Sequence, residues 1–445
     1  MGRRRRRLSD QPFEVEITAL DAKGLGLAEY EGKTLKVFDA LPGERVLARY
    51  LFGRSFRGKA ETLEVLNASP DRVEPRCPHF GVCSACSLQH MSMDAQLAYK
   101  QAALLHELGD VEPETIYEPL DGPAWNYRRK ARLSVRDVAA KERVLVGFRE
   151  RNGKFVADMA ECHVLRSEAA DLLPDLARLL ETMDGRSGFP QIEVACGDDR
   201  CALIIRHLAD VSEADRERLS QFSRQAGVGL YLQPGSADTV RLLAPADLQL
   251  QYRIEEHGLR IDFEPLDFLQ VNGGLNQLMV RRALELLEPG PADSVLDLFC
   301  GLGNFSLPLA KRAGAVTGVE GSAAMVARAR ANARLNGLEN TTFISADLYQ
   351  SSDAQAPWKQ ADFNKVLLDP PRSGALELLP WIAGTKAARV LYISCNPETL
   401  ARDAGMLVGE YGFRLSGAGI MNMFPHTPHS EAIALFERAA TENVP

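Results

Sequence analysis

From residue 261 to the C-terminus, short apolar runs alternate with segments of helical pattern, and this alternation strongly constrains the fold. It predicts a doubly wound α/β sheet, because each apolar run is typical of a strand that helices bury on both faces. The predicted strands, some with the polar turn that follows them, are 294–301, 315–320, 342–347, 365–372, 390–395, 412–415 and 431–436. Ligands of such sheets bind beyond the carboxyl ends of the strands, so we expect a site there.

The run 391–395 ends abruptly in Cys395, which is followed by the polar turn Asn396-Pro397. This position at the end of a predicted parallel strand makes Cys395 a candidate covalent nucleophile. The alternative is a small buried hydrophobe, the commoner fate of a free cysteine.

Length and composition indicate a protein of several globular domains. A chain of 445 residues predicts about three domains. The pattern divides it into 1–68, 69–93, 94–260 and 261–445. No apolar run approaches the ~18 residues that span a bilayer, and no apolar segment follows the arginine run at 3–7 as in a signal peptide. We therefore expect a cytoplasmic protein without a membrane partner.

The net charge of −8 is unevenly distributed along the chain. Residues 1–60 hold 13 Lys and Arg against 8 Asp and Glu, and residues 128–154 hold 10 against 3. Two basic patches in an otherwise acidic chain favour contact with RNA, although either could be an ordinary solvated face and the arginine run a disordered tail.

The N-terminal and central segments have different patterns. Short alternating runs between 13 and 65, punctuated by glycine and proline, predict a small all-β barrel. The region 94–255 is mixed α+β, with helical patterns at 94–108 and 172–183 and alternating strands at 130–136 and 144–148. A further hairpin is predicted from 192–196 and 201–205.

Cysteines cluster just after the predicted barrel. Cys77, Cys83 and Cys86 follow one another in C-x5-C-x2-C spacing, and Cys162 is the best placed fourth ligand. Four thiolates suit either a tetrahedral zinc or a [4Fe–4S] cluster, and the spacing does not decide between them. In a cytoplasmic chain the eight cysteines predict thiols, ligands or catalysis rather than a disulfide framework, and Cys196 and Cys201 read as filler rather than a metal pair.

The turn after the first strand of the α/β region predicts a nucleoside site. Asp297-Leu-Phe-Cys-Gly-Leu-Gly303 contains a Gly-x-Gly turn, but Ser306 stands where a dinucleotide fingerprint has its third glycine. Glu320 is placed to accept hydrogen bonds from ribose hydroxyls. With Asp347 after the third strand, the arrangement favours a class I S-adenosylmethionine site, with nicotinamide binding as the alternative.

The loop Asp369-Pro-Pro-Arg372 resembles the Asn/Asp-Pro-Pro-aromatic loop of amino methyltransferases, but Arg372 occupies the aromatic place. This departure favours methylation of carbon. Uracil C5 is a poor nucleophile, and addition of a thiolate at C6 converts the ring to an enolate that can attack a sulfonium methyl group. A base must then remove the C5 proton so that the thiolate can leave.

Taken together, the motifs at 267–272, 297–303, 369–372, 393–397 and 424–431 resemble those of the RNA uracil-C5 methyltransferases, and the resemblance covers essentially the whole chain. It implies a class I methyltransferase fold with Cys395 as the nucleophile and Glu431 as the base. It also implies an S-adenosylmethionine site formed by Gln270, Phe299, Asn304, Glu320, Asp347 and Asp369. His426 and His429 are assigned no catalytic role, and Gln270 and Asn272 could instead cap a helix near Leu275.

The N-terminal part of the chain favours the branch of the family that acts on 23S rRNA. The turns at 24–26 and 41–44 resemble a TRAM domain, an OB-like RNA-binding module, and the resemblance favours a [4Fe–4S] cluster on Cys77, Cys83, Cys86 and Cys162. Ser84-Ala85 departs from the two glycines usual in the family. The resemblance implies a monomer that methylates uridine 1939 of 23S rRNA. Alternatives are a tRNA uridine substrate, or a non-catalytic RNA-binding or redox-sensing protein.

Overall fold

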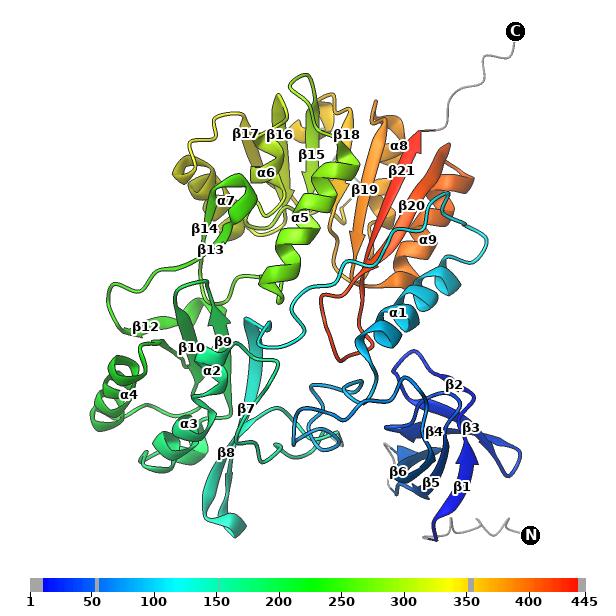
Figure 1. Cartoon of the computed structure of the whole chain (residues 1–445). Helices are drawn as coiled ribbons and strands as arrows, with labels where there is room; N and C mark the ends of the chain where they lie inside the picture. The colour runs from blue at the N-terminus through cyan, green and yellow to red at the C-terminus, as the bar shows by residue number, and fades with distance from the viewer. Residues whose placement is uncertain (1–10, 53–55, 152, 351–355, 439–445) are drawn as a thin grey trace, which may run out of the picture.

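The computed structural model describes residues 11–52, 56–151, 153–350 and 356–438, so the arginine run at 3–7 lies outside the described residues. The described part of the chain forms two six-stranded sheets, one seven-stranded sheet and a two-stranded hairpin (Figure 1). Each sheet corresponds to one of the patterns along the sequence. The N-terminal sheet corresponds to the short alternating runs, and the central sheet corresponds to the mixed α+β region. The seven-stranded sheet corresponds to the region in which strands alternate with helices.

The N-terminal sheet is barrel-like, as predicted, with strand order β1-β5-β6-β4-β3-β2. Its strands are β1 (Phe13–Glu16), β2 (Ala19–Leu20), β3 (Gly26–Tyr30), β4 (Lys33–Phe38), β5 (Arg45–Tyr50) and β6 (Lys59–Asn67). The buried carboxylate of Glu44 accepts hydrogen bonds from the Leu41 amide at 2.8 Å and from Arg72 Nε at 2.5 Å. Glu44 therefore fixes both the turn at 41–44 and the chain that leaves the barrel.

The central sheet has the order β12-β11-β10-β9-β7-β8. Its strands are β7 (Lys130–Val138), β8 (Arg143–Gly147), β9 (Gln191–Cys196), β10 (Cys201–Arg206), β11 (Gly229–Gln233) and β12 (Arg241–Ala244). The helices of this region are α2 (Ser167–Ala170), α3 (Leu173–Glu181) and α4 (Glu213–Ala226). The apolar faces of α3 and α4 bury Leu176 and Leu219 in the same core as Val194 of β9.

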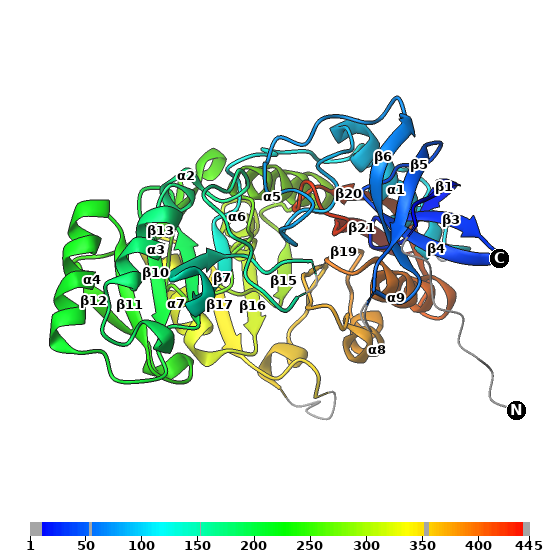
Figure 2. The same ribbon diagram turned by 90° about the horizontal axis from the view of Figure 1, so that it is seen from below.

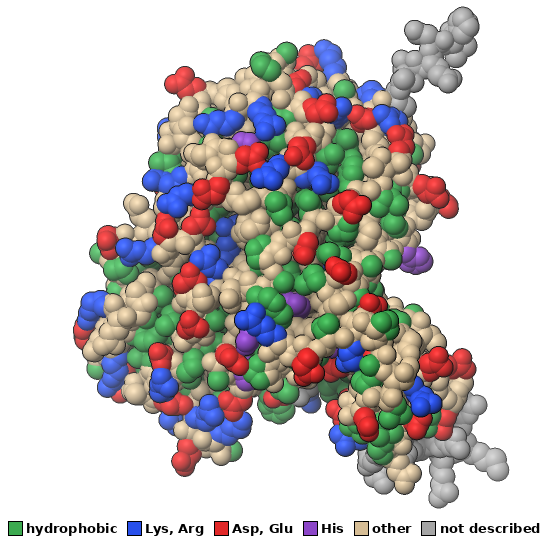
Figure 3. All heavy atoms as spheres, viewed as in Figure 1, with side chains coloured by type: hydrophobic (Ala, Val, Ile, Leu, Met, Phe, Trp, Pro, Cys, Tyr) green, Lys and Arg blue, Asp and Glu red, His purple; other side chains and the backbone are tan. Residues whose placement is uncertain are grey.

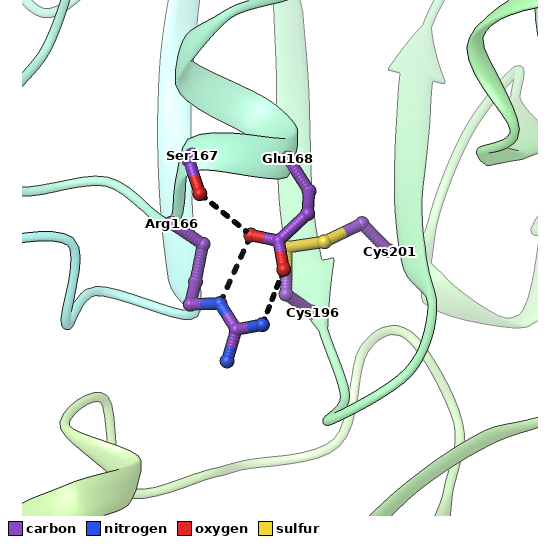
Figure 4. The surroundings of a disulfide bond; sticks show 5 residues. All are labelled: Arg166, Ser167, Glu168, Cys196 and Cys201. Atoms are coloured by element: carbon purple, nitrogen blue, oxygen red, sulfur yellow. Dashed lines mark hydrogen bonds and ion pairs between the residues drawn. A yellow bond between two sulfur atoms is a disulfide. The ribbon is translucent and has the colours of Figure 1, made fainter.

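The predicted hairpin of β9 and β10 forms, but the general expectation of thiols or ligands rather than disulfides is wrong for its two cysteines. Cys196 and Cys201 pair directly across the two strands, and their sulfurs form a disulfide of 2.09 Å (Figure 4). Both residues are buried in the central core, as filler residues would be, and the nearby Arg166 and Glu168 form an ion pair. Hairpin pairing brings two such side chains together whether or not they are oxidised, so the sequence pattern alone could not distinguish the two states.

The seven-stranded sheet has the order β17-β16-β15-β18-β19-β21-β20, and its first five strands are parallel. Its strands are β15 (Ser294–Leu298), β16 (Ala315–Glu320), β17 (Thr341–Ser345), β18 (Lys365–Leu368), β19 (Arg389–Ser394), β20 (Phe413–Met421) and β21 (Glu431–Arg438). The order reverses direction at β15 and β18, which is the switch point where a doubly wound sheet opens a crevice. The doubly wound α/β prediction is confirmed.

Helices cover both faces of this sheet, which explains the continuous apolar runs in its strands. One face packs against α5 (Gly273–Leu287), α6 (Ser306–Ala310) and α7 (Ala323–Leu335). The other packs against α1 (Met93–Leu108), α8 (Leu379–Gly384) and α9 (Pro397–Gly409). Successive residues of β19 alternate between the two cores, with Leu391 and Ile393 in the first and Val390 and Tyr392 in the second.

The chain between the barrel and the central sheet also packs on the seven-stranded sheet. Helix α1 lies against α9 and β20, and the segment after it runs parallel to β20 through the bridges of Ile116 with Ala418 and Leu120 with Met421. The hairpin of β13 (Leu250–Ile254) and β14 (Leu259–Phe263) leads from the central sheet into α5. In the described part of the chain, no helix is long and apolar enough to cross a membrane.

The barrel and the central sheet lie at opposite ends of the molecule, and the two views agree on this (Figures 1 and 2). Acidic and basic side chains are interspersed over the face seen in Figure 3. Within 128–154, Arg132, Arg143 and Arg151 form ion pairs with Glu193, Asp158 and Asp39, respectively. Folding therefore neutralises part of the basic patch in the sequence, and its contact with RNA stays a prediction.

Candidate active site

A cavity of about 760 Å³ opens beyond the carboxyl ends of the parallel strands, where the sequence predicted a site. This volume lies within the range of small-molecule and cofactor sites. All eight residues predicted to carry catalysis or bind the cofactor line the cavity. They are Gln270, Phe299, Asn304, Glu320, Asp347, Asp369, Cys395 and Glu431.

The turn after β15 forms one wall of the cavity. Phe299, Gly301 and Gly303 have positive φ angles of 65°, 55° and 92°, so the backbone folds back sharply at this turn. The Glu320 carboxylate, at the end of β16, accepts hydrogen bonds from the amide of Gly301 at 3.3 Å and from that of Ser322 at 2.9 Å. The turn and the acidic residue are thus held together.

Ser306 has a role of its own in this turn. Its hydroxyl donates to Asp297 Oδ2 at 2.5 Å, and both side chains are fully buried. Burial raises the pKa of Asp297 to about 7. The serine that replaces the third glycine of a dinucleotide fingerprint therefore holds a carboxyl group beneath the turn.

Two amide side chains also line the cavity. Asn304 exchanges two hydrogen bonds of 2.9 Å with Asn276 of α5, and it also accepts one from the Tyr252 hydroxyl at 3.1 Å. Gln270 Nε2 donates to Asp369 Oδ2 at 3.5 Å. Asn272 is the residue that caps α5, because its side chain accepts from the Leu275 amide at 3.1 Å.

The register of the last strands brings Cys395 and Glu431 to the same end of the sheet. β21 runs antiparallel to β19, and its Ala432 pairs with Ser394. Cys395 directly follows β19 and Glu431 begins β21, so the two side chains enter the cavity from neighbouring strands. A strand that starts where its neighbour ends places a carboxylate beside a thiol although 35 residues separate them.

Burial and mutual charge govern the titration of these groups. Burial, followed by the charges of Glu431 and Asp369, raises the pKa of Cys395 to about 11, while the Arg372 guanidinium partly opposes the rise. Burial and the neighbouring Asp369 also raise the pKa of Glu431, which is only 6 % exposed. Burial raises the pKa of Asp369 to about 7. The site thus has one cation among a thiol and two carboxyl groups.

Helix α9 holds the loop that carries this cation. Asn396 Nδ2 and Thr399 Oγ1 donate to the Arg372 carbonyl at 3.1 and 3.2 Å. Arg372 itself is exposed and lines the cavity. An arginine in the aromatic place of the Pro-Pro motif therefore puts a positive charge beside the thiol, where an aromatic ring would only stack.

The cysteine segment, defined as residues 77–91, lies between the barrel and the central sheet. Cys77, Cys83, Cys86 and Cys162 all line one small cavity, so the structure brings the four predicted ligands together. Among the described residues, however, no set of three or more His, Cys, Asp or Glu side chains is grouped so that it could hold a metal ion.

Burial raises the pKa of all four thiols of this cavity. Burial raises the pKa of Cys83 to about 11 and that of Cys86 to about 12. Burial also raises the pKa of Cys77 and Cys162, and this rise is partly opposed by nearby backbone amides, those of His79, His163 and Phe80 at Cys77. Amides directed at a sulfur stabilise its thiolate form.

Comparisons with known proteins agree with this geometry. A family model described as tRNA (Uracil-5-)-methyltransferase matches residues 201–439. The chain is 50% identical to the 23S rRNA (uracil(1939)-C(5))-methyltransferase RlmD of Alkalilimnicola ehrlichii, over 99% of this chain and 100% of that protein. It is 48% identical to the protein of the same name from Xanthomonas axonopodis pv. citri, over 98% and 100%. The chain belongs to the RNA uracil-C5 methyltransferase family.

A solved structure of a family member has the same fold. The tRNA (uracil-54, C5)-methyltransferase of Pyrococcus abyssi, determined with S-adenosyl-L-homocysteine, superimposes with a TM-score of 0.73. The match covers 95% of this chain and 99% of that one at 23% identity. The expected class I methyltransferase sheet, preceded by a barrel-like sheet and a central mixed sheet, is therefore confirmed.

Several side chains that line the cavity of the present structure were not given a role from the sequence. Tyr252, Tyr349 and His429 are among them. His429, to which the sequence gave no role, is exposed and stands two residues before Glu431. His429 lies in the loop before β21, outside any strand. No strand alternation in the sequence could therefore place it in the cavity.

Proposed function

We propose that this protein methylates C5 of a uridine in 23S rRNA, with U1939 as the expected target, and uses S-adenosylmethionine as methyl donor. The relatives named 23S rRNA (uracil(1939)-C(5))-methyltransferase RlmD are about half identical to this chain over their full length. The observation that carries the proposal is the entry of Cys395 and Glu431 into one cavity from adjacent strands. A thiol and a carboxylate are the two groups that C5 methylation of uracil needs.

In the proposed reaction, Cys395 Sγ adds to C6 of the uracil and the electron pair moves to C5 and O4. When bound, S-adenosylmethionine supplies an electrophilic methyl group, which C5 takes up. Glu431 then removes the C5 proton, the C5–C6 double bond re-forms, and the thiolate leaves. Arg372 favours the thiolate form of Cys395, because its charge lowers the pKa that burial raises.

The residues around the turn after β15 support the assignment of the cofactor site. We assign Glu320 to the ribose hydroxyls, and Gln270, Phe299, Asn304, Asp347 and Asp369 to the remaining wall. The target base must leave its helix to reach Cys395, so the cavity mouth has to accept a flipped nucleotide.

Substitutions of Cys395 and Glu431 test this division of roles. Cys395→Ala should abolish methylation and every covalent adduct, yet leave RNA binding intact. Glu431→Gln should still allow addition and methyl transfer but stall elimination, so an adduct stable to denaturing gels should accumulate. If Cys395→Ala forms that adduct, or Glu431→Gln turns over at the wild-type rate, the assignment fails.

A tRNA uridine is the second candidate substrate, because the matching family model carries a tRNA description. Mapping 5-methyluridine in the 23S rRNA and tRNA of a deletion strain separates the two. Loss of the methyl group from 23S rRNA position 1939 alone supports the proposal, whereas loss from tRNA alone contradicts it.

We also propose that Cys77, Cys83, Cys86 and Cys162 hold a [4Fe–4S] cluster. The shared cavity and the amides directed at Cys77 and Cys162 support it. A set that cannot hold one ion can still hold a cluster, because each sulfur then binds a different iron. Anaerobically purified protein should be brown and contain iron and acid-labile sulfide, and a colourless protein with stoichiometric zinc would contradict the cluster.

The division of the chain at 68, 93 and 260 and the monomeric state stay predictions. Light scattering of the purified protein tests the second, with a single species near 48.9 kDa as the expected result.

A further inference from the structure

The loop 422–430 connects β20 to β21 and ends at Glu431, the proposed base. Phe424 and His429 of this loop line the active-site cavity. His426, in its middle, is 5% exposed and has a φ of 65°, a left-handed conformation that non-glycine residues rarely adopt. Such a residue persists only where its surroundings hold it.

The cysteine segment holds His426 from one side. The amides of Ser87 and Leu88, directly after Cys86, both donate to the His426 carbonyl at 2.9 Å. The His426 amide in turn donates to Gln96 Oε1 of α1 at 2.8 Å. Both backbone groups of this residue are therefore fixed from outside the loop.

Gln96 joins the loop to the cysteine segment through one buried side chain. While its oxygen accepts from His426, its Nε2 donates to the carbonyls of Leu88 and Met91 at 3.0 and 2.8 Å. The residue is fully buried, so water cannot replace these bonds. Gln96 is thus bonded to both segments at once.

Residues 125–127, which lie next to the segment that carries Cys162, hold the same loop from the other side. The Trp125 ring stacks on the His426 ring with centroids 4.0 Å apart, and the Tyr127 hydroxyl donates to the Pro425 carbonyl at 3.3 Å. Asn126, between these two aromatic residues, donates its amide to the His163 carbonyl at 2.9 Å. The cysteine segment therefore contacts the loop directly, and the residue after Cys162 is joined to the loop through residues 125–127.

We propose that the cysteine segment supports catalysis through the loop 422–430, and that Gln96 is a positioning residue for Glu431. The proposal rests on the proposed function, in which Glu431 removes the C5 proton. If the Gln96 bonds are lost, His426 can relax from its left-handed conformation and Glu431 moves with the loop. A misplacement of about 1 Å can lower a rate by about 10²-fold.

Gln96→Leu tests the proposal, with Gln101→Leu as the matched control. Gln101 lies on the same helix and accepts from the Ile420 amide of β20 at 3.0 Å, so it bonds to the sheet rather than to the loop. Gln96→Leu should lower kcat on RNA about 10²-fold with little change in KM. It should accumulate the same covalent adduct as Glu431→Gln, because addition continues while elimination is slow. Gln101→Leu should do neither.

Hydrogen exchange provides a measurement independent of activity. Amides of 424–431 should exchange faster in Gln96→Leu and in Cys86→Ser than in the wild type, and at the wild-type rate in Gln101→Leu. If Gln96→Leu is poorly folded, Gln96→Glu serves instead, since it keeps the acceptor for His426 and loses both donated bonds. Unchanged exchange in the Gln96 variants, or equal exchange in the control, would overturn the proposal.

RNA with 5-fluorouridine at the target separates this inference from the function on which it rests. Fluorine cannot leave as a cation, so wild type and Gln96→Leu should both be trapped at similar rates. If the wild type is not trapped, the proposed function fails. If only Gln96→Leu is not trapped, Gln96 acts on addition rather than on Glu431, and the inference fails.

Discussion

Removal of the Asp403 carboxylate should destabilise the methyltransferase sheet and slow the reaction of Cys395. Asp403 lies on α9, and its side chain is fully buried. Its carboxylate accepts from the Tyr392 hydroxyl at 2.7 Å, from the Ala375 amide at 2.8 Å and from Arg402 Nε at 2.8 Å. It therefore ties β19, which ends just before Cys395, to the loop that carries Arg372.

The expected loss follows from the partners left behind. In Asp403→Ala the buried Tyr392 hydroxyl and the Ala375 amide lose their acceptor, at about 1–3 kcal/mol each. Arg402 is 41% exposed, so water solvates it and its loss adds little. Together these effects lower the free energy of unfolding by roughly 2–6 kcal/mol. Tyr392→Phe removes a single hydroxyl and should cost about 1 kcal/mol.

Urea unfolding followed by tryptophan fluorescence measures this loss, because Trp358 and Trp381 pack in the same core as Tyr392. A double-mutant cycle with Tyr392→Phe isolates the pairwise contribution. Trapping by 5-fluorouridine RNA should slow in Asp403→Ala while binding of S-adenosylmethionine stays unchanged. A loss below about 1 kcal/mol, or an unchanged trapping rate, would refute the reasoning.

Three further results are expected. Arg372→Ala removes the charge that partly opposes the rise of the Cys395 pKa to about 11, so trapping by 5-fluorouridine RNA should be slower at pH 7 and its pH profile should shift to higher pH. Arg372→Lys should keep the wild-type profile. The same profile for Arg372→Ala and the wild type would contradict the role of the charge. Asp297 has a folded pKa of about 7, above its ordinary value of 3.8, so its stabilising contribution is present below about pH 4 and falls by about 4 kcal/mol as pH rises through 7. Asp297→Asn should flatten this dependence in urea titrations, and an equal slope for both proteins would count against it. Protein that is prepared without reductant, stripped of iron and unfolded should contain six titratable thiols, and reduction should raise the number to eight. Eight thiols before reduction would exclude the Cys196–Cys201 bond.

The strands of the methyltransferase sheet could be predicted because burial on both faces leaves continuous apolar runs. β15, β16 and β18 begin at the predicted residues, and Cys395 follows the end of β19 as expected. Such a pattern does not predict the spatial order of the last two strands in the sheet. β21 lies between β19 and β20, and only this insertion brings Glu431 beside Cys395.

Contacts between distant parts of the chain could not be predicted, for a physical reason. The pattern of α1 shows that one face is buried, but not that the face packs on α9 and β20, some 300 residues later. The charge of 128–154 likewise shows ten basic residues, but not that Arg151 pairs with Asp39 of the barrel. Amphipathicity and charge specify that a residue needs a partner without specifying which partner.

The position of Glu431, the proposed base, gives a physical reason for the packing of N-terminal segments around the cavity. The proposed cofactor-binding residues at the ends of parallel strands, such as Glu320 and Asp369, are fixed by strands on both sides and by helices above and below. Glu431 instead begins an antiparallel strand, and no strand among the described residues pairs with the loop before it. Its support comes from α1, the cysteine segment and Trp125, all of which precede the methyltransferase sheet in sequence. A boundary drawn along the chain therefore does not divide the proposed catalytic groups, because the sheet holds the proposed nucleophile while the N-terminal half holds the proposed base.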